Sequence, residues 1–234
     1  MINELKKVQE AYSILSPGDA GYLGALSADH FHAIEEGRTT TDNGANIWVP
    51  WYHAHKTSEM LLDVYLYATD AALQETAWEM LMYYSDWVSN MMSGRSDVDR
   101  LKILRMEYGG MAEVFYQIYA IKREMKHLKI AKFFEEEGLL DNIYQNKDIL
   151  SGLHANTAIP KFLSTAAAYE ATGDEYYKTV CVNAFEMIMT RTYANGGTSR
   201  GEHWQAAGRL QTNNDTCETC CSYNMIKLAD YLYR

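Results

Sequence analysis

The sequence has few helix-breaking residues, few basic side chains and no long apolar run. It contains only 3 proline residues in 234, and no segment approaches the roughly 18 apolar residues that can cross a bilayer. Its 21 lysine and arginine residues are outnumbered by 31 aspartate and glutamate residues, so the basic stripe of nucleic-acid-binding proteins is missing. We therefore expect neither nucleic acid nor a membrane among its partners. The sequence does not identify a cellular compartment.

Apolar and aromatic residues are abundant, and cysteines are unevenly placed. A hydrophobic fraction of 47% and 18 tyrosines provide material for a core and exclude a disordered chain. Four cysteines are too few for a disulfide scaffold at this length. Cys181 lies in a helical apolar pattern and is expected to be buried, whereas Cys217, Cys220 and Cys221 cluster around Glu218. Thiols beside a carboxylate indicate a site for a soft metal ion.

A pattern ending in tyrosine recurs along the chain and predicts helical hairpins. Tyr67, Tyr119 and Tyr169 lie 52 and 50 residues apart, and each stands between two amphipathic helices. The predicted first helices cover residues 58–67, 111–120 and 160–171, and the second helices cover 71–91, 125–136 and 174–190. Residues 224–233 repeat the first helix once more. Two helices per period of about 50 residues predict an all-α fold of hairpins arranged in a stack or ring.

Chemically capable residues recur where the first helices of these hairpins are expected to begin. His55, Glu107 and Cys221 each lie 12 residues before their repeat tyrosine, and His154 and Glu218 lie 15 residues before theirs. If the first helices form an inner ring, these side chains gather at one rim. Helix capping is the competing interpretation, because polar residues commonly satisfy the free N–H groups at helix starts.

Two loops carry aromatic residues beside histidines and carboxylates. They are residues 46–55 and 193–204, and they include Trp48, Trp51 and Trp204. Tryptophan and tyrosine faces suit sugar rings, although tryptophan is equally at home in a core. For Trp78 and Trp87, which lie inside helical patterns, we expect burial in the core.

Several segments resemble the β-L-arabinofuranosidase glycoside hydrolases of families 127 and 146. The resemblance covers nearly the whole chain in order and is carried by WVPWYHAHK at residues 48–56, EYGGM at 107–111, GLHANTAIPK at 152–161, GGTSRGEHW at 196–204, and ETC followed by YNMIKL at 218–228. It implies an (α/α)6 barrel followed by β-sandwich domains and a substrate that carries L-arabinofuranose.

The resemblance also implies unusual chemistry for a glycosidase. Most retaining glycosidases pair two carboxylates. This family instead uses a zinc-bound cysteine thiolate as nucleophile, a glutamate as general acid/base, and one Glu and three Cys as zinc ligands. Glu202 matches the acid/base, while Glu218 and Cys220 match the first two zinc ligands. His55 and His154 match positions that bind the sugar hydroxyls, and Glu107 is assigned there too.

One departure from the family pattern concerns the nucleophile. In the family an adjacent Cys–Cys pair containing it lies well downstream of the Glu-x-Cys element, whereas only 14 residues follow Cys220 here. Residues 1–234 are therefore expected to be a partial barrel, incomplete at the C-terminus and inactive alone. Cys217 and Cys221 have no family role. An exposed barrel seam predicts association into oligomers.

Three alternatives remain open at the level of sequence. One is another (α/α)6 glycosidase, such as an unsaturated glucuronyl hydrolase, which rests on fold analogy alone. A second is a zinc-stabilised helical module, closed by the clustered cysteines with Glu218 or His203. A third is a non-catalytic sugar-binding remnant, in which replacing Glu202 leaves sugar affinity intact.

Overall fold

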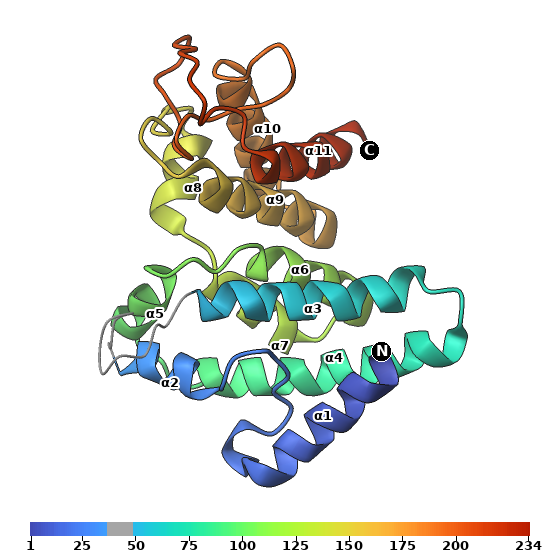
Figure 1. Cartoon of the computed structure of the whole chain (residues 1–234). Helices are drawn as coiled ribbons and strands as arrows, with labels where there is room; N and C mark the ends of the chain where they lie inside the picture. The colour runs from blue at the N-terminus through green and yellow to red at the C-terminus, as the bar shows by residue number, and fades with distance from the viewer. Residues whose placement is uncertain (37–48) are drawn as a thin grey trace. The chain divides into compact units, whose positions relative to one another are not determined.

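The computed structural model describes residues 1–36 and 49–234, and its regular elements are helices (Figure 1). Within these ranges there are eleven α-helices and one short 3₁₀-helix, and extended pairing is limited to isolated bridges. No helix in the described ranges is long and apolar enough to cross a membrane. The all-α class predicted from the sequence is confirmed, while closure into an (α/α)6 barrel stays a prediction.

The chain forms two compact units, and residues 1–114 with 123–134 make the first. Its helices are α1 (Ile2–Leu15), η1 (Pro17–Asp19), α2 (Asp29–Glu35), α3 (Pro50–Tyr67), α4 (Ala71–Met92), α5 (Asp97–Leu104) and α7 (Met125–Phe133). Helices α3, α1 and α7 each pack against α4, so the long α4 organises this unit. Its core is aromatic: the rings of Phe31, Trp51 and Trp87 lie within 6.1 Å of one another, centroid to centroid.

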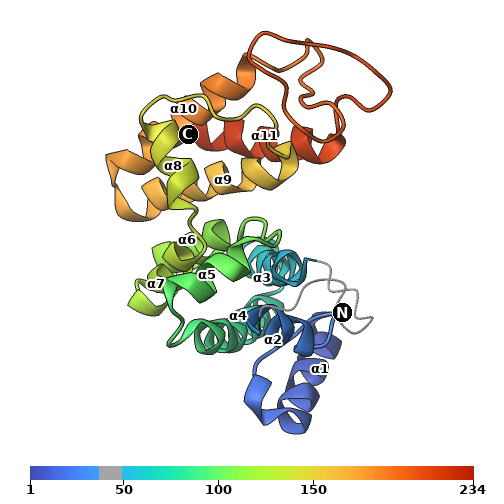
Figure 2. The same cartoon turned by 90° about the vertical axis from the view of Figure 1, so that its left-hand side faces the viewer.

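The second unit contains residues 115–122 and 135–234. It includes most of α6 (Met111–Lys122), together with α8 (Glu137–Tyr144), α9 (Ala155–Thr172), α10 (Glu175–Met189) and α11 (Thr219–Tyr233). Helix α9 packs against both α10 and α11, and α8 packs against α10 (Figure 2). Apolar side chains from these four helices form one buried cluster, which Trp204 joins from the loop between α10 and α11.

The tyrosine pattern marks helix ends, and the aspartates beside it explain why a second helix follows. Asp70 accepts hydrogen bonds from the N–H groups of Ala72 and Leu73, and Asp174 accepts one from the N–H of Tyr176. These side chains satisfy donors that the first turn of a helix leaves free. The hairpins α3–α4 and α9–α10 are packed pairs, as the repeat predicts.

The middle hairpin differs from the prediction. Helix α7 ends at Phe133, and the following residues form the separate helix α8. Helix α7 packs against α4 in the first unit, whereas residues 115–122 of α6 belong to the second unit. Helix α9 begins at Ala155 rather than at Pro160, which lies inside the helix. Proline lacks the N–H for the preceding turn, and burial of Pro160 within the core packing of α9 offsets that loss.

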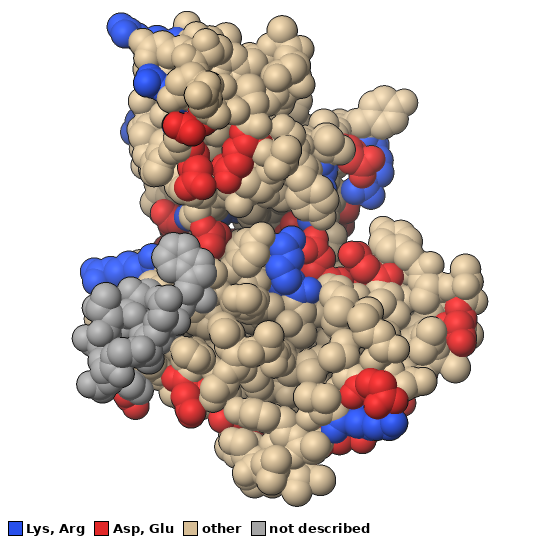
Figure 3. Space-filling model, viewed as in Figure 1, with Lys and Arg blue, Asp and Glu red and all other residues tan. Residues whose placement is uncertain are grey.

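Acidic and basic side chains are interspersed among uncharged ones on the face shown in Figure 3. Several charged side chains form ion pairs at the surface; for example, Nζ of Lys6 lies 2.7 Å from Oε2 of Glu79.

Candidate active site

The first turn of α9 holds His154 by one of its ring nitrogens. His154 is the N-cap residue, and its Nδ1 accepts a hydrogen bond from the backbone N–H of Thr157 at 3.1 Å. The hydroxyl of Thr157 lies 2.9 Å from the same nitrogen. The sequence analysis offered capping and sugar binding as competing interpretations of this residue. The structure shows that His154 caps its helix with Nδ1, which leaves Nε2 to contact other groups.

Backbone hydrogen bonds bring a distant loop to this helix start. The N–H of Ala155 donates to the carbonyl of Glu202 at 2.8 Å, and the N–H of Trp204 donates to the carbonyl of Leu153 at 3.0 Å. These bonds lie on either side of His203, so they fix the register of the loop against the residues that begin α9. Glu202 and His154, 48 residues apart in sequence, consequently become neighbours.

The carboxylate of Glu202 meets the free side of the imidazole. Its Oε2 lies 3.2 Å from Nε2 of His154, while the Glu202 side chain remains 60% exposed. A carboxylate that is held at one oxygen and open to solvent can exchange a proton with a bound molecule. The sequence assigned Glu202 and His154 separate roles, and the structure places them in direct contact.

The Glu202 loop has an unusual backbone conformation. Ser199, Gly201 and Glu202 have φ angles of +75°, +53° and +63°. For residues with a Cβ, this left-handed region costs about 1 kcal/mol or more, so surrounding contacts must maintain it. Buried Trp204 provides one such contact, because its indole N–H donates to the hydroxyl of Thr198 at 3.1 Å.

A buried ion pair anchors the base of the same loop. The guanidinium of Arg191 is almost fully buried and forms a bidentate ion pair with the carboxylate of Asp148. The hydrogen bonds from Arg191 lower the pKa of the Asp148 carboxyl below its ordinary value of 3.8. The backbone carbonyl of Arg191 accepts the hydroxyl of Thr198, which links the ion pair to the hydrogen bond of Trp204. The sequence analysis missed both charged residues, because they are 43 residues apart and carry no local motif.

Three potential metal ligands converge at the start of α11. One ligand atom from each of Glu218, Cys220 and Cys221 lies within 4.8 Å of the other two. Glu218 is the N-cap residue, yet its side chain makes no capping hydrogen bond. The residues alone grouped the clustered cysteines with Glu218, and the resemblance assigned ligand roles to Glu218 and Cys220 only. The structure brings the sulfur of Cys221 to these two ligands. The adjacent position of Cys221 in the first helical turn was the available signal.

The donor set fits a divalent cation. Burial and the carboxylate of Glu218 raise the pKa of the Cys220 thiol to about 11, and burial followed by the same carboxylate raises the pKa of the Cys221 thiol still further. Two thiols and a carboxylate repel one another when ionised, and a bound cation removes that penalty. Sulfur and carboxylate oxygen are ligands that zinc accepts.

Cys217 is separated from this group by its own contacts. Its Sγ lies 3.7 Å from the side-chain amide of Asn195, and its Cβ is so close to Gly197 that a Cβ there would come within 2.5 Å of it. Within the described residues, the cluster of ligand atoms includes neither Cys217 nor His203. The local zinc module proposed as an alternative from the sequence therefore lacks these two ligands.

His55, on α3, and Glu107, on the tight turn before α6, both lie in the first unit. The N–H of Gly110 donates to Nδ1 of His55 at 3.0 Å, and the N–H of Gly109 donates to Oε1 of Glu107 at 3.1 Å. A Cβ on Gly109 would come within 2.4 Å of the His55 ring, so glycine is required there. Nε2 of His55 lies 3.5 Å from Glu59, and the ring is buried. The predicted contact of His55 and Glu107 with sugar stays a prediction.

The aromatic residues expected to line a sugar site are mostly core residues. Trp51 and Trp204 are buried, and Trp51 packs edge-on to Phe31 with ring centroids 4.9 Å apart. Of the two interpretations that the sequence left open for these tryptophans, sugar stacking and burial in a core, the structure supports burial. Trp87 is buried as expected, and Trp78 is half-buried and packs against Tyr65. Trp48 lies outside the described residues.

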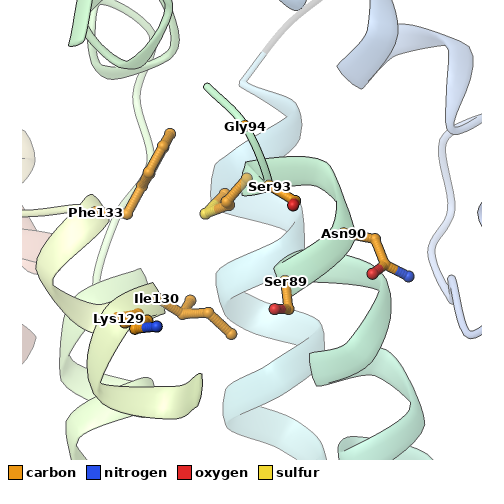
Figure 4. Close-up of a pocket in the computed structure, with 8 residues that line it drawn as sticks. Ser89, Asn90, Ser93, Gly94, Lys129, Ile130 and Phe133 are labelled. Atoms are coloured by element: carbon orange, nitrogen blue, oxygen red, sulfur yellow. The ribbon is translucent and has the colours of Figure 1, made fainter. Parts of the chain in front are cut away.

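A hollow of about 410 Å³ lies between the C-terminal ends of α4 and α7 in the first unit (Figure 4). Ser89, Ser93, Lys129 and Phe133 are among the residues that line it. None of the residues that the sequence analysis assigned to a site borders this hollow. We therefore locate the candidate active site at the starts of α9 and α11 and not at this hollow.

Comparison with known proteins identifies a family. The family described as "Beta-L-arabinofuranosidase, GH127 catalytic domain" matches residues 1–234. No curated protein matches the chain.

Proposed function

Because the chain belongs to the family of GH127 β-L-arabinofuranosidase catalytic domains, we propose that it takes part in a retaining cleavage of β-L-arabinofuranosides. The family match over all 234 residues is the observation that carries this proposal. A glycoside hydrolase domain acts on a carbohydrate, and the family description gives the sugar as L-arabinofuranose. Plant-type arabinofuranosides are the substrate class we propose.

We assign the general acid/base to Glu202. A glycosidase needs a carboxyl group that protonates the leaving oxygen and later deprotonates water. Glu202 is exposed enough to reach a substrate, and its backbone is fixed by hydrogen bonds to the start of α9. This combination of a fixed backbone and an accessible carboxylate supports the assignment.

We assign the metal site to Glu218 and Cys220, with Cys221 within reach of the same ion. A zinc ion bound there would lower the pKa of coordinating thiols, so that thiolate exists at neutral pH. The carboxylate of Glu218 is available because it does not cap its helix. The neighbouring thiols are protonated at neutral pH while no cation is bound, since their pKa values are raised.

His55 and Glu107 are proposed to contact the hydroxyl groups of the sugar. Both are held by a glycine turn whose backbone N–H groups fix one atom of each side chain. Fixed side chains lose little entropy when a ligand binds, which suits a sugar whose affinity depends on several hydrogen bonds. The domain itself is proposed to be part of an (α/α)6 barrel, supported by the packed hairpins α3–α4 and α9–α10.

The nucleophile is expected outside the group formed by Glu218, Cys220 and Cys221. In the family it belongs to a separate Cys–Cys pair, and Cys220 already occupies the upstream ligand position. Residues 1–234 alone are therefore expected to bind the sugar without cleaving it.

Binding and cleavage by the chain test these assignments separately. We would measure binding of methyl β-L-arabinofuranoside by calorimetry, with the α-anomer and the corresponding pyranoside as competitors of matched composition. Preference for the β-furanoside is expected in the wild-type chain and in Glu202→Gln. Glu186→Gln, an exposed glutamate on α10, is the matched control. Equal binding of all three sugars, or of none, would overturn the proposed function.

Cleavage and metal content complete the test. We expect no release of aryl alcohol from an aryl β-L-arabinofuranoside, with or without added zinc. Release that is lost in Glu202→Gln but not in Glu186→Gln would refute the expected inactivity and support the acid/base assignment. Elemental analysis after exhaustive dialysis should find less than one zinc per chain, because only two of the four ligands that the resemblance implies, Glu218 and Cys220, are assigned here. One tightly held zinc would indicate a self-contained metal site.

A further inference from the structure

We propose that His154 is a positioning residue for Glu202, and that the first turn of α9 fixes the proton of its imidazole on Nε2. The ring then donates to Oε2 of Glu202 and leaves Oε1 as the oxygen that exchanges the catalytic proton. This inference rests on the proposed function of Glu202 as acid/base. It gives His154 a role different from the direct sugar contact that the resemblance implies.

The tautomer of His154 follows from its helix cap. A backbone N–H can only donate, so the N–H of Thr157, 3.1 Å from Nδ1, requires a lone pair on that nitrogen. A neutral imidazole carries one proton, which must therefore be on Nε2. The Thr157 hydroxyl, 2.9 Å from the same Nδ1, also has a proton to donate. Because a hydroxyl can also accept, the backbone N–H decides the tautomer and the hydroxyl is compatible with it.

The Nε2 proton faces the carboxylate of Glu202. The Nε2–Oε2 distance is 3.2 Å, and the backbone hydrogen bond from Ala155 to the carbonyl of Glu202 keeps the two side chains in register. The left-handed φ of Glu202 is part of that geometry. The neighbouring His203 is occupied elsewhere, because its Nδ1 lies 2.7 Å from the carbonyl of Gly201. His154 is therefore the ring that orients this carboxylate.

A donor fixed on Oε2 serves both protonation states of Glu202. When Glu202 is the acid, its proton is on Oε1 and Oε2 is a carbonyl oxygen that still accepts from Nε2. When Glu202 is the base, Oε2 is a carboxylate oxygen and accepts the same hydrogen bond. The opposite tautomer would present the lone pair of Nε2 to Glu202. That lone pair would compete for the proton of the carboxylic acid or repel the carboxylate anion.

The proton balance of the proposed cycle uses Oε1 alone. In the first half, the proton on Oε1 passes to the glycosidic oxygen, the enzyme nucleophile bonds to the anomeric carbon, and the bond between that carbon and the glycosidic oxygen breaks, with its electrons staying on the oxygen. In the second half, Oε1 takes a proton from the water whose oxygen bonds to the anomeric carbon and displaces the enzyme nucleophile. His154 keeps its Nε2 proton throughout.

Nitrogen NMR of the 234-residue chain tests the tautomer directly. With ¹⁵N-labelled histidine at mildly alkaline pH, the signals of His154 are identified by their loss in His154→Asn. We expect the pattern of an imidazole with a protonated Nε2 and an unprotonated Nδ1. Glu202→Gln should leave this pattern unchanged, since the helix cap imposes it. A mixture of tautomers in the wild-type chain, or one that appears in Glu202→Gln, would overturn the proposal.

A second readout separates positioning from a purely structural role. His154→Asn retains an acceptor for the Thr157 N–H but removes the donor that faces Glu202, so the helix keeps its cap. We expect it to shift the carboxyl ¹³C signal of Glu202, assigned with Glu202→Gln. Thr157→Val retains the backbone N–H and should leave that signal in place. An unchanged Glu202 signal in His154→Asn would refute the positioning role.

Failure of this inference and failure of the proposed function give different results. Selective binding of the β-furanoside by a chain with mixed His154 tautomers would refute the inference and leave the function standing. The Nε2–H tautomer in a chain that binds no arabinofuranoside would refute the proposed function and the catalytic use of this contact together.

Discussion

Removal of the carboxylate at Asp148 should destabilise the second unit, because it leaves the charge of Arg191 buried without a partner. The Arg191 side chain is 1% exposed, and Asp148 contacts it through both carboxylate oxygens. Loss of one member of a buried ion pair costs about 3–5 kcal/mol. The Asp148 side chain is 33% exposed, so water replaces part of its contact, and we expect about 2–3 kcal/mol for Asp148→Ala.

The effect should extend to the loop that carries Glu202. The carbonyl of Arg191 accepts the hydroxyl of Thr198, and Thr198 accepts the indole N–H of Trp204. The indole N–H resonance of Trp204 therefore reports on this anchor. Urea unfolding followed through that resonance gives the free energy of unfolding of the unit that contains it. In thermal unfolding, a loss of this size corresponds to roughly 4–12 °C, at about 2–4 °C per kcal/mol for a chain of this length.

A surface ion pair of the same unit provides the matched control. Glu170 lies 3.6 Å from Arg234, and both side chains are about half exposed. Such pairs contribute about 0–1 kcal/mol, so Glu170→Ala should have little effect. If Asp148→Ala and Glu170→Ala destabilise the chain equally, the argument that burial of Arg191 makes its partner essential is refuted.

Three further predictions concern pH, packing and thiol reactivity. Because Arg191 lowers the pKa of Asp148, the stabilisation of the fold by this ion pair is present above pH 3.8 and is lost as the pH falls through the pKa of Asp148 in the folded chain. In urea titrations at acid pH, the difference in unfolding free energy between wild type and Asp148→Asn should therefore shrink toward zero. Gly110→Ala should destabilise the first unit by about 1–3 kcal/mol in thermal unfolding, since a Cβ would lie 2.8 Å from His55, whereas Gly138→Ala meets open space and should be neutral or stabilising. Burial raises the pKa of Cys181 to about 12, so a thiol reagent at pH 8 should label it only after unfolding; rapid labelling of the folded chain, located by mass spectrometry, would show that this thiol is accessible.

The sequence was sufficient for the helices and for the membership of the family. Hydrophobic spacing is a local signal, and it located both ends of α4 and α10 within one residue, whereas α9 begins five residues before its predicted start. The same signal extended α7 by three residues beyond Phe133 and did not predict α8. It also did not show that α6 is shared between two compact units, which depends on packing rather than on periodicity.

Burial of Trp87 was predicted from its helical pattern, whereas burial of Trp51 and Trp204 could not be decided from the sequence. Trp51 and Trp204 stand in polar or glycine-rich segments that resemble exposed loops, yet both are buried. Trp204 reaches the core because its neighbours pair with the residues that begin α9. A window of local sequence contains no information about such a partner.

The sequence by itself determined which residues are proposed to carry the chemistry, since short motifs point to Glu202, Glu218, Cys220 and His154. Tertiary structure decided how they are used. It placed Glu202 at the free nitrogen of His154 and added the sulfur of Cys221 to the ligand group. The physical reason is that motifs and helical periods act over a few residues, whereas the contact between Glu202 and His154 depends on a backbone pairing across 48 residues of chain.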